Sequence, residues 1–188
     1  MRAQHSCFGF EAPATDGLFF ALFPDAAAVE RLARTAQQLR IRHRLGGRAF
    51  APERFHVSLV GFGAHAGLPH ELVASAAEAA QAIALQPFEV TFDRAVSFLG
   101  KSRPLVLCNE DDVPELIGLQ RALGSEVRKR GLGRARPQWT PHITLLYDEC
   151  AIEDHAIEPV RWTVREFALV HSLRGQGTYV PLGRWPLR

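Results

Sequence analysis

The chain has 188 residues, of which 47% are hydrophobic and 22% are charged, as in an ordinary globular protein with one sizeable core. Its 22 Lys and Arg residues nearly balance 20 Asp and Glu residues, and the net charge of +2 argues against a strongly basic polyanion binder. The three cysteines form no CxxC pair, which argues against both a disulfide framework and a thiolate zinc site.

The N-terminal segment, residues 1–16, has no hydrophobic periodicity, so we expect a flexible leader before a single domain over 17–188. No apolar signal-peptide core follows Arg2, and no stretch approaches the roughly 18 apolar residues of a membrane span. These features, together with free thiols, predict a cytoplasmic protein. We also expect a monomer that needs neither a cofactor nor a metal.

The first half of the domain is predicted to combine strands and helices. A short apolar run after Gly17 indicates a buried strand, and Asp25 is placed to cap the helix that follows. Gly46 and Gly47 are expected to end that helix. The full set of expected elements is a strand at 18–23, a helix between 25 and 46, a strand ending near 60, a helix over 70–85, and strands at 88–92 and 95–99.

The second half repeats the order of strand, helix and strand, which predicts two pseudo-repeat lobes at about 17–100 and 101–188. This pattern favours an α+β fold with antiparallel or mixed sheets, helices on the outside and a central cleft between the lobes. The expected elements are a strand at 105–108, a helix over 113–130, and strands at 139–147, 160–173 and 178–182.

Two short stretches are near copies of each other: HVSL at 56–59 and HITL at 142–145. Alternate residues of a strand share a face, so His56 and Ser58 point one way, and His142 and Thr144 do the same in the second copy. Each copy therefore presents one imidazole and one hydroxyl above an apolar underside. A symmetric fold places both copies in the central cleft.

Two imidazoles and two hydroxyls suit the chemistry of phosphodiesters. One imidazole can accept a proton while the other donates one near neutral pH, because histidine titrates at about 6.5. The hydroxyls of Ser58 and Thr144 can donate to phosphate oxygens as charge builds in the transition state. The pattern predicts a hydrolase that cleaves a phosphodiester without a metal.

HVSL and HITL resemble the paired motifs of the two-histidine (2H) phosphoesterases, and in particular the RNA 2′,3′-cyclic phosphodiesterase or 2′-5′ RNA ligase family. The resemblance extends to LFFALFPD at 18–25, GRAFAPERFHVSL at 47–59 and FALVHSLRGQGTYVPLGRWPL at 167–187. It implies hydrolysis of a 2′,3′-cyclic phosphate, on RNA ends or nucleotides, to a 2′-phosphomonoester. It also implies that His56 is the acid, His142 the base, and Ser58 and Thr144 the phosphate-binding residues.

The chain departs from this family at two places: Thr140 and Tyr147 stand where many relatives have arginine. Three alternatives stay open for this reason. The protein is an RNA-end-binding module without turnover, a 2H enzyme for another substrate such as ADP-ribose 1″,2″-cyclic phosphate or an oligoadenylate, or an enzyme that also runs the reverse 2′-5′ ligation.

Further candidates come from residues near the two motifs. His171 is interpreted as an ordinary strand residue, with a zinc site of His56, His142 and His171 as a remote alternative. A run of basic residues at 128–136 is either an electrostatic guide for a phosphate-bearing substrate or a solvated face. Possible substrate contacts, which have packing as their alternative where they are aromatic, are Arg48, Arg54, Phe55, Trp139 and Tyr147.

Overall fold

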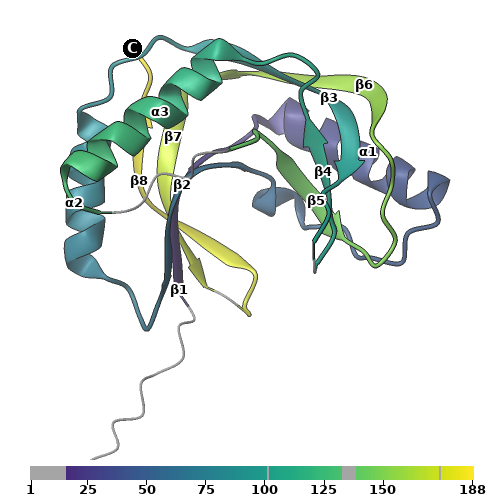
Figure 1. Cartoon of the computed structure of the whole chain (residues 1–188), viewed down its shortest axis with the longest axis horizontal. Coiled ribbons are helices and arrows are strands. Elements are labelled where there is room, and N and C mark those ends of the chain that lie inside the picture. The colour runs from purple at the N-terminus through teal and green to yellow at the C-terminus, as the bar shows by residue number, and fades with distance from the viewer. Residues whose placement is uncertain (1–15, 101, 133–138, 174) are drawn as a thin grey trace, which may run out of the picture.

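A computed structural model describes residues 16–100, 102–132, 139–173 and 175–188 of the protein (Figure 1). Within these ranges it contains one eight-stranded sheet of order β6-β3-β4-β5-β2-β1-β7-β8, in which every neighbouring pair is antiparallel. The elements are β1 (Asp16–Leu22), α1 (Ala26–Arg42), the short 3-10 helix η1 (Pro52–Arg54), β2 (Val57–His65), α2 (His70–Gln81), β3 (Phe88–Ser97), β4 (Pro104–Cys108), α3 (Pro114–Lys129), β5 (Ile143–Tyr147), β6 (His155–Val164), β7 (Glu166–Leu173) and β8 (Thr178–Pro186).

The sheet consists of two four-stranded halves that meet at β5 and β2. Val57 and Ile143 form the one bridging pair between these strands in the described part of the chain. The two halves splay apart from this junction (Figure 1). The expected α+β class is confirmed, and the sheet is wholly antiparallel rather than mixed.

The two halves of the sheet are interleaved in sequence. One half contains β3, β4, β5 and β6, whereas the other contains β1 and β2 from the start of the chain together with β7 and β8 from its end. The expected lobes at 17–100 and 101–188 therefore do not coincide with the halves of the sheet. The reason is that the chain crosses from β6 in one half to β7 in the other at Arg165.

Helices α1 and α3 each contact strands of the half of the sheet that does not contain the strand before them. Helix α1 follows β1 but contacts β5 and β6, whereas α3 follows β4 and contacts β2 and β3. Helix α2 lies against α3 and β8, so α2 and α3 are at one side of Figure 1 and α1 at the other. These contacts couple the two halves of the sheet.

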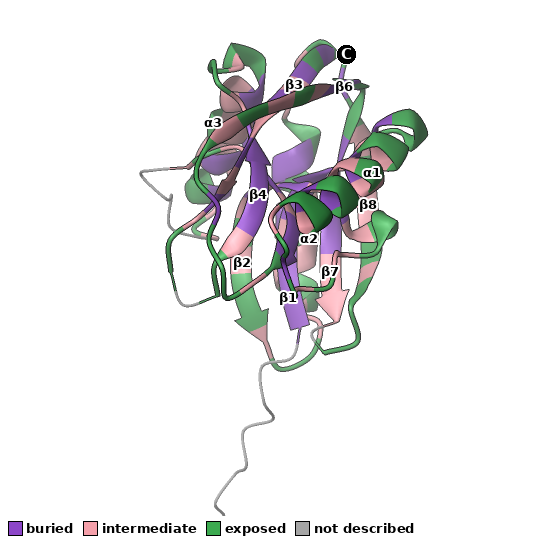
Figure 2. Ribbon diagram, turned by 90° about the vertical axis from the view of Figure 1, so that its right-hand side faces the viewer, coloured by how far each residue is buried: buried purple, intermediate pink, exposed green. Residues whose placement is uncertain are grey.

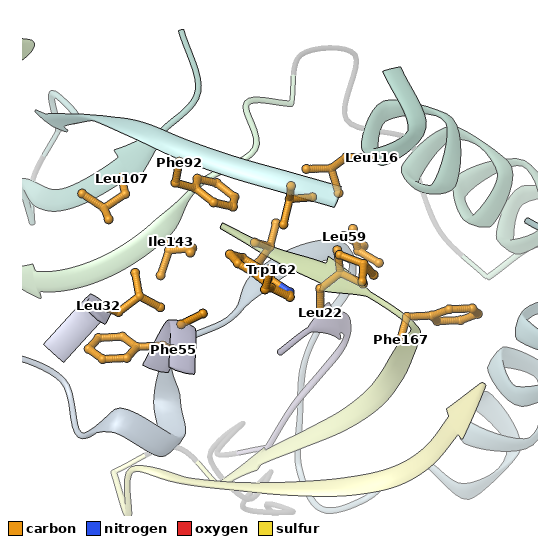
Figure 3. Close-up of a cluster of buried hydrophobic side chains, with 14 of the residues drawn as sticks. Leu22, Leu32, Phe55, Leu59, Phe92, Leu107, Leu116, Ile143, Trp162 and Phe167 are labelled. Carbon is orange, nitrogen blue, oxygen red and sulfur yellow. The ribbon is translucent and has the colours of Figure 1, made fainter. Parts of the chain in front are cut away.

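The hydrophobic core runs through both halves. Helix α1 begins where the Asp25 carboxylate accepts a hydrogen bond of 2.8 Å from the Ala28 amide, as expected for a cap. Helix α3 buries Leu116, Leu119 and Leu123 on one face. Strands β1 and β4 are largely buried, whereas the outward faces of α1 and α2 are exposed (Figure 2). The shared core includes Leu32, Phe92, Ile143, Trp162 and Phe167 (Figure 3).

Several expected boundaries are wrong for reasons of tertiary structure. Asp16 belongs to β1 and is buried, so it is not part of a flexible leader, and residues 1–15 lie outside the described ranges. Gly61 and Gly63 do not end β2, because two bulges against β1 keep the strand paired as far as His65. The strand expected at 160–173 is two strands, β6 and β7, in different halves. In contrast, β3 is one strand where two were expected.

Two other elements, a helix and a strand, are shorter than expected. Helix α2 ends at Gln81, and β5 begins only at Ile143, after Pro141. Pro141 lacks the amide that a sheet ladder requires. No helix in the described part of the chain is long and apolar enough to cross a membrane.

We expect Gly47→Ala to lower the free energy of unfolding by about 1–3 kcal/mol, the usual cost of overpacking. A Cβ at Gly47 would lie 2.0 Å from the carbonyl oxygen of Tyr147 at the end of β5. The neighbouring Gly46 is the matched control, because a Cβ there meets nothing within 4 Å. Urea denaturation of both variants measures the difference, and equal stabilities would contradict the close approach.

Candidate active site

The two histidines occupy equivalent places in the two halves of the sheet. His56 directly precedes β2, and His142 directly precedes β5. In both stretches the aliphatic residues are buried, while the histidine and the hydroxyl residue are partly exposed. The expected alternation of faces is therefore present on both sides of the junction.

The register at the junction brings the two motifs into one site. Val57 lies opposite Ile143 in the antiparallel β2–β5 pair. Continued by one residue in each direction, this register places His56 opposite Thr144 and Ser58 opposite His142. Directly opposite residues have Cβ atoms about 4.5–5.5 Å apart. Two imidazoles and two hydroxyls thus alternate around a small quadrilateral on one face.

Both imidazoles are held in the same way. The Nδ1 atom of His56 lies 2.7 Å from the carbonyl oxygen of Arg54, and the Nδ1 atom of His142 lies 2.8 Å from that of Thr140. A carbonyl oxygen only accepts, so each Nδ1 carries the hydrogen, and in the neutral ring Nε2 carries the lone pair. The Nε2 atom of His56 lies 3.0 Å from Ser58 Oγ, which donates to it in this tautomer.

The environment of His56 lowers its pKa to about 4. Burial is the main cause, because it removes water from the charged form. The hydrogen bond to the Arg54 carbonyl oxygen raises the pKa, whereas the electrostatic interactions with His142 and with the Arg54 guanidinium lower it further. His56 is therefore neutral at pH 7 in the unliganded protein, with its Nε2 ready to accept a proton.

Aromatic rings surround the two imidazoles. The His56 ring lies 5.2 Å from the Phe19 ring, 6.3 Å from the Phe23 ring and 5.2 Å from the Tyr179 ring, measured between centroids. The Phe98 ring lies edge-on to His142 at 5.0 Å. These rings account for the dry surroundings of His56.

Sequence reasoning missed these rings, although one signal was present. In β1 the alternate residues Leu18, Phe20 and Leu22 enter the main core, which leaves Phe19 on the opposite face with His56. No local signal identifies Tyr179 or Phe98, because each reaches its histidine through strand pairing distant in sequence.

The three aromatic candidates for substrate contact differ in burial and in their contacts. Phe55 is 1% exposed and packs in the core near Leu32 and Ile143 (Figure 3), so its burial is incompatible with stacking on a substrate. Trp139 donates a 3.0 Å hydrogen bond from Nε1 to the Ser58 carbonyl oxygen and packs against the core. It therefore fastens the segment before β5 to the first motif. Tyr147 is 47% exposed and stays accessible.

The two arginine candidates also differ. Arg48 is exposed, whereas Arg54 is partly buried and lies over the Phe50 ring, with its guanidinium carbon 4.1 Å from the centroid. The same carbon lies 5.4 Å from the Tyr179 centroid. Arg54 thus places a positive charge beside His56 and holds the His56 ring through its carbonyl oxygen.

His171 lies outside the site. Its Nε2 donates a hydrogen bond to one carboxylate oxygen of the buried Asp16, whose other oxygen accepts a 3.0 Å hydrogen bond from the Gly67 amide. This fits the interpretation of an ordinary strand residue. A zinc site with His56 and His142 is not supported, because no group of three or more His, Cys, Asp or Glu side chains in the described ranges is arranged to hold a metal.

The basic run at 128–136 is only partly described. Lys129 and Arg130 both bind the Glu126 carboxylate, at 2.6 and 2.7 Å, so their charges are engaged on the helix itself. Arg134 and Arg136 lie outside the described residues. For the described part, a solvated helix end fits better than an electrostatic guide.

Comparisons of the sequence and of the structure with known proteins agree on one family. A family model described as the 2′-5′ RNA ligase superfamily matches residues 23–176. The RNA 2′,3′-cyclic phosphodiesterase of Escherichia coli strain K12 is 34% identical over 151 residues, covering 75% of this chain and 80% of that protein. The crystal structure of E. coli LigT in apo form has a TM-score of 0.74 at 30% identity and covers 92% of this chain and 97% of that one. That of LigT complexed with 3′-AMP has a TM-score of 0.71 at 30% identity, covering 92% and 98%.

Protonation of His56 is expected to oppose folding. Its pKa is about 4 in the folded protein and about 6.5 for an unperturbed histidine, so between these values the unfolded chain binds the proton more readily. The free energy of unfolding should therefore fall as the pH drops from about 6.5 to about 4, by at most about 3 kcal/mol.

Urea denaturation from pH 4 to 7 measures this dependence. The matched variant is His56→Asn, whose amide can still donate to the Arg54 carbonyl but does not titrate, and its pH dependence should be shallower. An NMR titration that gives His56 a pKa of 6.5 or above would contradict the environment described for this ring.

Proposed function

The chain belongs to the 2′-5′ RNA ligase superfamily, and from this premise we propose that it hydrolyses RNA 2′,3′-cyclic phosphates to 2′-phosphomonoesters. The observation that carries the proposal is the alternation of His56, Thr144, His142 and Ser58 around the β2–β5 junction. Such an arrangement offers proton transfer on both sides of a phosphorus atom. The LigT neighbour with bound 3′-AMP supports a nucleotide as the substrate class.

In the proposed reaction a water molecule attacks the phosphorus of the cyclic phosphate. His142 Nε2 accepts the proton of this water, the bond from phosphorus to the 3′ oxygen breaks, and His56 Nε2 gives its proton to that oxygen. The product has a 2′-phosphate and a free 3′ hydroxyl. This assignment of acid and base follows the family resemblance. The same steps, with a 5′ hydroxyl in place of water, give 2′-5′ ligation.

Ser58 and Thr144 are proposed to hold the phosphate. The Ser58 hydroxyl lies 3.0 Å from Nε2 of His56, and the extended register sets Ser58 opposite His142 and Thr144 opposite His56, so both hydroxyls are proposed to flank the position between the imidazoles. A hydroxyl aimed at a non-bridging oxygen strengthens its hydrogen bond as charge develops there. Arg54 adds a positive charge that already acts on His56 in the free site.

The acid role of His56 requires proton uptake on binding. With a pKa of about 4 the free ring is neutral at pH 7. A phosphodiester anion placed between the imidazoles favours the protonated form of a histidine. Substrate binding is therefore coupled to protonation of His56. The ring can then act as a proton donor only when a phosphate is bound.

A second candidate is an RNA-end-binding module without turnover. The observation that favours it is the pair Thr140 and Tyr147, which stand where many relatives have arginine. Such a module binds RNA ends in a salt-dependent way but does not release product. The turnover measurement below separates the two functions.

We expect turnover of an oligoribonucleotide that ends in a 2′,3′-cyclic phosphate, in the presence of EDTA, with a 2′-phosphate as the product. Replacing either histidine, in His56→Ala or His142→Ala, should reduce kcat by about 10²–10⁴-fold, the usual contribution of a general acid or base. The control is His171→Ala, which removes a histidine outside the site. Wild-type protein that binds the RNA but leaves the cyclic phosphate intact would favour the binding module.

The pH dependence of kcat/KM should be bell-shaped, because one histidine must be protonated and the other neutral. The acidic limb should lie below pH 6.5, since the pKa of His56 in the free site is about 4. Initial rates from pH 3.5 to 9 measure the profile. A rate that does not change over the range in which histidine titrates would rule out the acid and base pair.

A further inference from the structure

A continuous series of ring contacts leads away from His56 across the face of the molecule. The Tyr179 ring stands at 89° to the His56 ring with centroids 5.2 Å apart. The Arg54 guanidinium bridges Tyr179 and Phe50, at 5.4 and 4.1 Å from their centroids. The Phe50 ring then meets Tyr147 at 5.6 Å and 61°. Tyr179, Arg54, Phe50 and Tyr147 are called the aromatic strip below.

The aromatic strip combines segments that are distant in sequence. Tyr179 comes from β8, Arg54 from η1, Phe50 from the loop after α1, and Tyr147 from the end of β5. Phe50 is fixed by a 2.8 Å hydrogen bond from its amide to the Leu145 carbonyl oxygen, which aligns its loop with β5. The strip is therefore anchored to the same strand that carries His142 and Thr144.

The outer end of the strip opens into a groove. Tyr147 is 47% exposed and lines a cavity of about 980 Å³ together with Gly47, Ser102, Arg103 and Asp148. Tyr147 lies three positions beyond Thr144, a rise of about 10 Å in an extended chain. Stacked bases follow one another at about 3.4 Å. The strip thus continues for more than one base beyond the phosphate position.

The charges along this path suit bases better than phosphates. The groove is lined by Arg103 but also by Asp148 and Glu149, so it is not basic. Asp148 accepts hydrogen bonds from the amides of Gly47 and Cys150, which lower its pKa and keep it ionised. Aromatic faces and an arginine plane are the surfaces on which nucleobases of any sequence stack.

The guanidinium of Arg54 is suited to stacking against a nucleobase. Among the residues that the structure describes, its side chain forms no ion pair, and its Nε atom is buried without a hydrogen-bond partner. Its charge is held between two rings instead of being cancelled by a carboxylate. A guanidinium stacked in this way attracts both a base face and the neighbouring phosphates.

We propose that the site takes the end of an RNA strand in preference to a mononucleotide, with the bases upstream of the cyclic phosphate stacking along the aromatic strip. This inference rests on the proposed function for the reaction at the phosphate. It assigns the exposed Tyr147 to stacking of an upstream base. The terminal base lies nearest Tyr179, and the next reaches Phe50 and Tyr147.

The test compares kcat/KM for adenosine 2′,3′-cyclic phosphate with that for a penta-adenylate ending in a 2′,3′-cyclic phosphate. We expect the wild type to prefer the pentamer, and Tyr147→Ala to reduce the ratio of the two kcat/KM values about tenfold, as for the loss of one stacked base. Tyr147→Phe keeps the ring and should keep the ratio. Ile41→Ala, at an exposed apolar residue of α1, is the control for removal of surface side chain.

The outcomes distinguish the strip from the reaction. A ratio that is the same in wild type and Tyr147→Ala would overturn the strip while leaving hydrolysis in place. If the wild type turns over neither substrate, the proposed reaction fails, and fluorescence anisotropy with a labelled penta-adenylate carrying a 2′-phosphate tests the strip alone. Weaker binding to Tyr147→Ala than to Tyr147→Phe would then support the strip, and equal binding would overturn it.

Discussion

The site depends on a single point of contact between two half-sheets, the pairing of Val57 with Ile143. Because this pair is buried, its register decides which residues face the opposite side, and there His56 meets Thr144 while Ser58 meets His142. A slip of one residue would turn every one of these side chains into the core. The chemistry is therefore specified by the same apolar pair that joins the halves.

Helices α1 and α3 and the side chain of Trp139 fix the junction between β2 and β5. Helix α1 contacts β5 and β6 in one half, and α3 contacts β2 in the other half together with β3. Trp139 adds a direct link from the segment before β5 to the Ser58 carbonyl oxygen. A change in the angle between the halves would disturb two helix interfaces and this hydrogen bond together, so the catalytic groups are held in place before substrate binds.

The surroundings of the site favour a substrate with extended aromatic character. Phe19, Phe23 and Tyr179 pack around His56, and the burial of this ring lowers its pKa. The same Tyr179 begins the strip that runs through Arg54 to Tyr147. In our proposal, one set of rings thus both buries the histidine assigned as the acid and provides the path for an RNA strand. The positive charge beside His56 comes from Arg54.

The sequence by itself determined the motif residues, the Asp25 cap, the apolar faces of the helices and the α+β class, because each of these depends on side chains close together along the chain. Only the tertiary structure decided how the halves are composed, since β6 and β7 look like one strand at 160–173 yet belong to different halves. It also decided that Phe55 is core, that Lys129 and Arg130 bind Glu126, and that Phe50 and Tyr179 border the site. The local alternation of apolar and polar residues indicates which face of a strand a residue lies on. Strand pairing between segments distant in the sequence decides which residues that face contacts.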